Sequence, residues 1–280
     1  MFLRHGWVVR FETPPGQQGR FDRSPCTIPL GGLTTRVVLF SLTLGYSQRK
    51  VYWPSLVGTQ PAVFEALEAA LQLVGGVPKQ LLVDSARAFV VEADPARFAW
   101  NRRFLELCGH YRVQPCAHRP GRPRAKGKGE RPFFTLEEQL IEGGRWADLD
   151  AFARDLAAFA AEQDQRIHGA TGERPAERFE RERASLTPLP TRPFVGTHEE
   201  VRKVSWDCLI SFGGVRYSVP WRYAGEQVWL RPSRGTHLVV RDRRGEEIAR
   251  HALSTRKGVT VLDPAHYEGL RGSRGARRRP

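Results

Sequence analysis

Apolar and polar positions follow two different periods in the first third of the chain. Thr35–Leu44 and Arg49–Ser55 are rich in β-branched and aromatic residues, and a short turn that begins at Gly45 separates them. This arrangement predicts a β-hairpin. Over Gln60–Val74 the apolar residues recur every three or four positions, which predicts one buried face of a helix. The Gly-Gly pair that follows is expected to end that helix.

Shorter apolar runs predict the elements that complete a sheet. Strands are expected at Gly19–Asp22, Lys79–Asp84 and Arg112–Ala117, and a helix at Asn101–Tyr111. The rest of residues 1–30 is rich in Gly and Pro and is expected to be irregular. Strand–helix–strand units place neighbouring strands parallel, so the fold class is α/β with a mixed sheet flanked by helices. If the strand that ends at Asp84 lies parallel beside the strand that ends at Asp22, the two carboxylates are neighbours.

The second half of the chain changes from helical to β-rich patterns. Helices are expected from about Arg131 and over Leu149–Ile167, and a proline-rich stretch follows them. Five short β-rich runs then predict a small all-β barrel: Cys208–Phe212, Val215–Val219, Gln227–Arg231, His237–Arg241 and Ile248–His251. The expected organisation is an α/β domain over residues 1–185, a linker over 186–198, a β-barrel over 199–270 and a basic disordered tail over 271–280.

The charge of the chain indicates the chemistry of its partner. A formal net charge of +14 favours a polyanion, and nucleic acid is the leading candidate. No run approaches eighteen consecutive apolar residues and the first residues lack a secretion signal, so no membrane association is expected. The four cysteines show no disulfide framework, which fits a reducing cytoplasm.

Three acidic residues lie in sequence surroundings that suit phosphodiester chemistry. Such chemistry on DNA commonly uses two divalent metal ions held by carboxylates, and magnesium prefers hard oxygen ligands. Asp22 and Asp84 each close a predicted strand, and Glu130 follows the loop HRPGRPRAKGKG. Five basic residues of this loop precede Glu130: Arg119, Arg122, Arg124, Lys126 and Lys128. They suit contacts with a DNA backbone, although a solvated basic loop beside a helix-capping Glu130 is the alternative.

Several longer motifs carry a family resemblance. The runs NRRFLELCGHYRVQPCAHRPGRPRAKGKGER and RIHGATGERPAERFERERASLTPLP, together with FETPPGQQGRFD and GGVPKQLLVD, resemble IstA-type transposases of bacterial insertion sequences. The late run ISFGGVRYSVPWRYAGEQVWLR matches that family as well, so the resemblance covers nearly the whole chain in order. These transposases are encoded together with an AAA+ ATPase helper.

The resemblance implies a fold, a site and a reaction. It implies a ribonuclease-H-like integrase catalytic core over residues 1–185, followed by a small β-barrel that binds DNA. Asp22, Asp84 and Glu130 become the catalytic metal ligands for magnesium, or for manganese in its place. The implied reaction is DNA cleavage at the ends of the element and strand transfer into target DNA. The implied partners are DNA, the ATPase helper and further copies of the chain, in the bacterial cytoplasm at the nucleoid.

The sequence also departs from the family pattern. Arg23-Ser24 stands where the family has Trp-Gly, Ser85 where it has Asn, and Gly129 where it has a hydrophobic residue. The family's amino-terminal helix-turn-helix region has no counterpart in this sequence. A truncated, catalytically impaired remnant that binds DNA is therefore an alternative, and a nuclease of the same fold that cuts without joining is another.

Three further patterns admit a functional and a structural interpretation. Cys108, His110, Cys116 and His118 have a spacing that could suggest zinc, but we expect buried cysteines and exposed histidines. His168 could act as a general base, and a structural role at a helix end is favoured. Five aromatic residues of the last domain could stack on bases, and a place in the barrel core is favoured: Trp206, Tyr217, Trp221, Tyr223 and Trp229.

Overall fold

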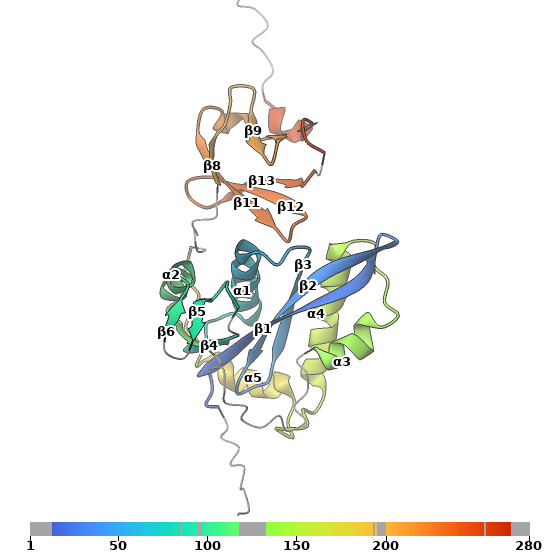
Figure 1. Ribbon diagram of the computed structural model, residues 1–280, viewed down its shortest axis with the longest axis vertical. Coiled ribbons are helices and arrows are strands. Elements are labelled where there is room, and N and C mark those ends of the chain that lie inside the picture. The colour runs from blue at the N-terminus through green and yellow to red at the C-terminus, as the bar shows by residue number, and fades with distance from the viewer. Residues whose placement is uncertain are drawn as a thin grey trace, which may run out of the picture. The chain divides into compact units, whose positions relative to one another are not determined.

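The computed structural model (Figure 1) describes residues 13–84, 86–94, 97–117, 133–192, 194, 200–254 and 256–269. The chain divides into two compact units, Met1–Thr191 and Arg192–Pro280. In the described part of the chain, no helix combines the length and the apolar character that crossing a membrane requires.

A five-stranded mixed sheet forms the centre of the first unit. Its strands are β1 (Gln18–Leu30), β2 (Leu33–Leu44), β3 (Lys50–Ser55), β4 (Gln80–Val83) and β7 (Gln114–Ala117). Their order across the sheet is β3-β2-β1-β4-β7. β1, β2 and β3 pair antiparallel, whereas β4 lies parallel to both β1 and β7. The hairpin and the mixed sheet that the sequence predicts are both present.

The strand β1 is much longer than predicted, and the expectation of irregular structure up to residue 30 is wrong. β1 pairs with β2 from Gly19 to Leu30 and returns through a turn in which Gly31 and Gly32 both have positive φ, at 56° and 81°. That geometry suits a tight hairpin turn. Its other edge pairs with β4 only as far as Phe21. Prolines are therefore tolerated in its second half, where no partner needs the missing N–H.

Helices cover the two faces of the sheet. On one face α1 (Gln60–Val74) and α2 (Arg102–Tyr111) lie over a group of aromatic residues that includes Phe21 and Phe40, whose rings are stacked 5.9 Å apart. The other face is covered by α4 (Leu149–Gln165) (Figure 1), which packs against Leu39 and other apolar residues of β1 and β2. Both faces of β2 are therefore buried.

The remaining elements of the first unit are short. They are the hairpin strands β5 (Val90–Asp94) and β6 (Arg97–Trp100), helix α3 (Phe134–Leu136), the π-helical turn η1 (Glu137–Ile141) and helix α5 (Pro175–Arg183). The helix expected from about Arg131 is described from Phe134 onward. Neither α5 nor the hairpin of β5 and β6 is predicted from the sequence.

The second unit is all-β. Its four-stranded sheet has the order β13-β12-β11-β8, with β8 (Glu200–Lys203), β11 (Gln227–Ser233), β12 (His237–Arg241) and β13 (Glu247–Ala252). A second sheet contains β9 (Leu209–Phe212), β10 (Val215–Ser218) and β14 (Thr260–Val261). Short 3-10 turns, η2 (Trp221–Tyr223) and η3 (Pro264–Tyr267), complete the unit. Tyr217 and Leu230 bring the two sheets into one core. The predicted fold class, a mixed sheet flanked by helices followed by a small all-β region, is confirmed.

Candidate active site

Asp22 and Asp84 lie next to each other at the point where β4 ends. The last register pair between β1 and β4 is Phe21 with Val83, so Asp22 and Asp84 are the next residues on two neighbouring parallel strands. Neighbouring strands lie about 4.8 Å apart, and residues in register point to the same face of a sheet. The predicted proximity of the two residues is confirmed. Because Phe21 points to the face of α1, Asp22 points to the face that α4 covers.

The local structure holds both carboxylates at the surface. Asp84 follows directly after β4, and its Oδ1 accepts a hydrogen bond of 3.0 Å from the backbone N–H of Ala86. This bond turns the chain away from the sheet. The Asp84 side chain is 47% exposed and that of Asp22 is 21% exposed. A ligand from solution can therefore reach both.

Two arginines of β1 balance the charge of the aspartates. Arg20 Nε lies 2.6 Å from Asp22 Oδ2, and Arg23 Nε lies 4.0 Å from Asp84 Oδ2. Two carboxylates on adjacent strands repel each other, and a guanidinium beside each one reduces that repulsion. Arg23 is also one of the residues that depart from the family pattern. It places a cation beside Asp84, where a metal ion would need the same oxygens.

Glu130, the third predicted ligand, lies outside the described residues. So do the five basic residues predicted to contact DNA: Arg119, Arg122, Arg124, Lys126 and Lys128. Within the described ranges, no group of three or more His, Cys, Asp or Glu residues could hold a metal ion. Among the described residues, the candidate site therefore consists of Asp22 and Asp84.

The carboxylate oxygens of Asp22 and Asp84 suit a hard divalent cation. Two partly exposed carboxylates on adjacent strands offer the oxygen ligands that magnesium prefers, and solvent access leaves room for the waters that it keeps. Opposite Asp22 on β2 stands Ser41, whose hydroxyl is buried and has no hydrogen-bond partner among the described residues. Ser41 therefore adds a polar side chain beside Asp22 in the same row of the sheet.

The zinc alternative finds no support in the described residues. Cys108 is buried on α2, and burial raises the pKa of its thiol to about 12. Burial also raises the pKa of the Cys116 thiol on β7. Zinc binds the thiolate, so a thiol that stays protonated is a poor ligand. His118, the fourth residue of the pattern, lies outside the described residues.

The motif RIHGATGERPAERFERE has a structural role that the sequence analysis missed. Glu182 of α5 is fully buried, and its two carboxylate oxygens each accept a 3.0 Å hydrogen bond, from the backbone N–H groups of Gly16 and Ser47. Arg178 donates to the carbonyl oxygen of Tyr46 at 2.9 Å and lies over the Tyr46 ring. The motif therefore fixes the start of β1 and the turn between β2 and β3. Pro175 lies in the first turn of α5, where proline is favoured, so it is a sequence signal from which the start of this helix could have been predicted.

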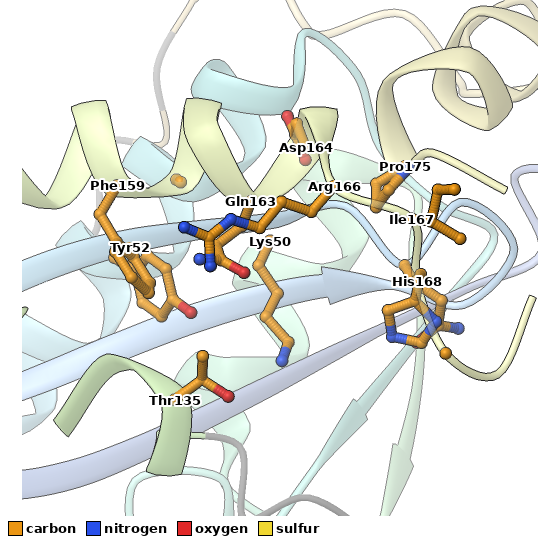
Figure 2. Close-up of a pocket in the computed structure, with 13 residues that line it drawn as sticks. Lys50, Tyr52, Thr135, Phe159, Gln163, Asp164, Arg166, Ile167, His168 and Pro175 are labelled. Atoms are coloured by element: carbon orange, nitrogen blue, oxygen red, sulfur yellow. The ribbon is translucent and has the colours of Figure 1, made fainter. Parts of the chain in front are cut away.

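The partly buried first residues of β3 border a small cavity (Figure 2). Its volume is about 200 Å³, and β3, α3, α4 and the segment after α4 line it. His168 is one of the lining residues, and its backbone closes a turn through hydrogen bonds from Thr171 and Gly172. This turn agrees with the structural role favoured for His168.

The aromatic residues of the second unit divide between core and surface. Tyr217 is fully buried, as expected for a core residue. Trp206 is 84% exposed, so the expectation of a core position is wrong for this residue. Its indole lies against Gly225, where a side chain would meet the ring at 3.3 Å. Trp221 is also partly exposed, and its indole N–H donates to the carbonyl oxygen of Glu268 at 2.7 Å.

Comparison with known proteins finds similarity over both units. Residues 189–263 match the family model of the Mu transposase C-terminal domain. The chain is 32% identical over 267 residues to the transposase for insertion sequence element IS21 from Pseudomonas aeruginosa, which covers 94% of this chain and 68% of that protein. It is 29% identical to the putative transposase for insertion sequence element IS5376 from Geobacillus stearothermophilus, over 92% of this chain and 64% of that protein. The chain thus spans about two thirds of the length of these curated relatives.

One solved structure similar to the chain is the integrase catalytic core domain of HTLV-2 in complex with magnesium. The alignment covers 59% of this chain and 97% of that chain, with a TM-score of 0.42 and 16% sequence identity.

Proposed function

This chain belongs to the IS21 family of insertion-sequence transposases, and on that premise we propose that it cuts DNA at the ends of an insertion sequence and joins those ends to target DNA. The observation that carries this proposal is the pair Asp22 and Asp84, adjacent on parallel strands and open to solvent. Paired carboxylates on a strongly basic chain suit phosphodiester chemistry, because the excess of Lys and Arg attracts the DNA that the carboxylates alone would repel.

The proposed site holds divalent metal through Asp22, Asp84 and Glu130, with magnesium as the natural ion and manganese as a substitute. Bound at such a site, a divalent ion activates the attacking oxygen and stabilises the leaving oxygen. The chain's own contribution is to keep two carboxylates in fixed register on rigid strands. Arg119, Arg122, Arg124, Lys126 and Lys128 are proposed to hold the DNA backbone beside them.

The proposal includes partners. DNA of the element ends and of the target is the substrate, and a multimer of the chain is expected to bring two ends together. The AAA+ ATPase helper and a place at the bacterial nucleoid follow from the family resemblance. The β-rich unit, which matches the Mu transposase C-terminal domain, is proposed to bind DNA.

A strand-transfer assay with pre-cut ends tests the proposal. Asp22→Asn, Asp84→Asn and Glu130→Gln each remove one ligand charge at nearly constant size. Each variant is expected to lose joining in magnesium and in manganese while binding DNA about as tightly as the wild type. Glu180→Gln on the exposed face of α5 is a matched control that should join normally. Robust joining by any of the three site variants would refute the assignment of that residue.

A catalytically impaired DNA-binding remnant is the second candidate, and Arg23 favours it. Its guanidinium lies 4.0 Å from Asp84, where the resembled family carries Trp. Wild-type protein that binds ends without cutting or joining, with activity gained in Arg23→Trp, supports the remnant. Cut products without joined products support the nuclease instead.

A further inference from the structure

The cavity beside β3 contains positive charge and hydrogen-bond donors. Two of its cationic residues are Lys50 of β3 and Arg166, which follows the end of α4. Around them lie Tyr52, Thr135, Gln163 and His168. In Figure 2 the amino group of Lys50 extends toward Thr135, and the Arg166 and Gln163 side chains lie together on the α4 side of the cavity. These groups suit an anion with several oxygen atoms.

The acidic residue of the cavity turns away from it. Asp164 lines the cavity, but its Oδ2 lies 3.2 Å from Arg49 Nε. Figure 2 shows its carboxylate pointing away from Lys50. Arg166 is held in place by hydrogen bonds to Gln139 and to the exposed Glu162. Gln163 also donates a hydrogen bond to Gln139, so neighbouring side chains fix Arg166 and Gln163 in the wall of the cavity.

The cavity lies on the same sheet face as Asp22. In the register of β1, β2 and β3, Tyr52 lies opposite Ser41, and Ser41 lies opposite Asp22. Residues in one such row point to the same face, and two steps between strands amount to about 10 Å. Each strand of duplex DNA carries a phosphate every 3.4 Å or so along the helix axis. Ser41 and Thr43 are buried, so a DNA strand reaches Lys50 from Asp22 around the covered part of β2, after at least about three nucleotides.

The size of the cavity selects a small group. Its 200 Å³ or so is below the roughly 300–1,000 Å³ of pockets that enclose drug-sized molecules. A phosphate group with a few waters fits this space.

We propose that the cavity formed by Lys50, Arg166, Gln163 and His168 binds one phosphate of the DNA backbone, at least about three nucleotides from the phosphate at the aspartate pair. This proposal rests on the proposed function for its ligand, since it takes DNA as the polyanion. The site fixes the direction in which the strand leaves the aspartate pair, toward the side of the sheet where β3 lies. The phosphate belongs either to the element end or to the target strand, and the chemistry of recognition is the same.

Salt dependence of DNA binding tests the site without requiring catalysis. Each phosphate neutralised contributes about 0.9 to the slope of log K against log salt for duplex DNA. With the full chain and labelled duplexes in EDTA, Lys50→Gln combined with Arg166→Gln is expected to lower that slope by about 0.9. Lys50→Arg should keep the wild-type slope, because it keeps the charge. Arg102→Gln is the matched control: its side chain is 92% exposed on α2, and its slope should equal that of the wild type.

Replacement of single phosphates by uncharged methylphosphonates locates the contact. One position, at least about three nucleotides from the reactive bond, should weaken binding by the wild type and have no further effect on the double variant. Placing the replacements in a pre-cut end or in target DNA identifies which strand supplies the phosphate. A double variant with the wild-type slope, an equal loss in Arg102→Gln, or the absence of a coupled position in both duplexes would overturn the site. Failure of joining with the slope change intact would instead count against the proposed function alone.

Discussion

Glu182 offers the sharpest test of how this chain positions its candidate site. The side chain is fully buried, and its two oxygens accept hydrogen bonds from Gly16 just before β1 and from Ser47 in the turn before β3. These two positions lie 166 and 135 residues away in the sequence. The carboxylate therefore connects α5 to the end of the sheet where β1 begins and where β2 turns into β3.

The magnitude of the effect follows from the two donors that Glu182→Ala would orphan. Leaving a buried N–H group without a partner costs about 1–3 kcal/mol, so the loss of both bonds costs about 2–6 kcal/mol. The total stability of a domain is only about 5–15 kcal/mol. Glu182→Gln retains one carbonyl acceptor but turns an NH₂ group toward the other N–H. We expect it to cost about half as much as the alanine variant.

Urea unfolding and hydrogen exchange measure these effects separately. Glu182→Ala should lower the urea midpoint of the first unit, and the amides of Gly16 and Ser47 should lose protection before the rest of the sheet. Glu180 lies exposed on the same helix, so Glu180→Ala controls for helix propensity and for loss of charge. An unchanged midpoint and unchanged protection of both amides in Glu182→Ala would refute the reasoning.

Three further outcomes are expected. Burial lowers the pKa of His266 below its usual value of about 6.5, so the unfolded chain binds the proton more readily than the folded chain. The urea midpoint of the second unit should therefore be highest above about pH 6.5 and should fall as the pH drops below that value. This pH dependence should be lost in His266→Gln. Cys108, with its pKa raised to about 12, should resist iodoacetamide at pH 8 until the protein unfolds, and rapid labelling of the native protein would contradict its burial. Gly16→Ala should destabilise more than Gly143→Ala in thermal unfolding: both glycines have positive φ, but only at Gly16 would a Cβ lie 2.4 Å from the carbonyl oxygen of Ser185.

The elements with strong periodicity could be predicted from the sequence alone. The helix expected over Gln60–Val74 has those bounds in the structure, because its apolar spacing and the left-handed Gly75 after it are both local signals. The strand expected over Lys79–Asp84 is observed as Gln80–Val83. Its parallel pairing with β1 could be predicted from the strand–helix–strand order. That pairing is enough to bring Asp22 and Asp84 together.

The length of β1 and the presence of α5 could not be predicted from the hydrophobic pattern. Pro25 and Pro29 argued against a long β1, yet they lie beyond Phe21, where β1 no longer pairs with β4. The glycine pair at Gly31 was an available hairpin signal between two β-rich runs. α5 is so polar that its pattern resembled a solvated segment, although Glu182 and Phe179 are buried in the sheet unit. Burial of a carboxylate depends on distant backbone donors and has no local signature.

The candidate phosphate cavity belongs to the part that no local pattern could predict. Lys50 and Arg166 are more than a hundred positions apart, and they meet only because α4 crosses β3 and ends beside it. By contrast, the relation of Lys50 to Asp22 follows from strand register once the order β3-β2-β1 is known. A site formed by neighbouring strands, such as the aspartate pair, can thus be predicted from the sequence. A site that also needs a helix to cross the sheet, such as the cavity, cannot.

The placement of β1 connects these features. Its start is held by the bond from Gly16 to Glu182, and its far end by the hydrogen bond from Gly31 to the carbonyl oxygen of Trp146. Both holding residues follow the sheet in sequence: Glu182 lies on α5, and Trp146 lies just before α4. A shift of β1 by one residue would turn Asp22 to the opposite face and separate it from Asp84. The segments after the sheet therefore do more than cover it, because they hold both ends of β1 in the register in which Asp22, Ser41 and Tyr52 share one face.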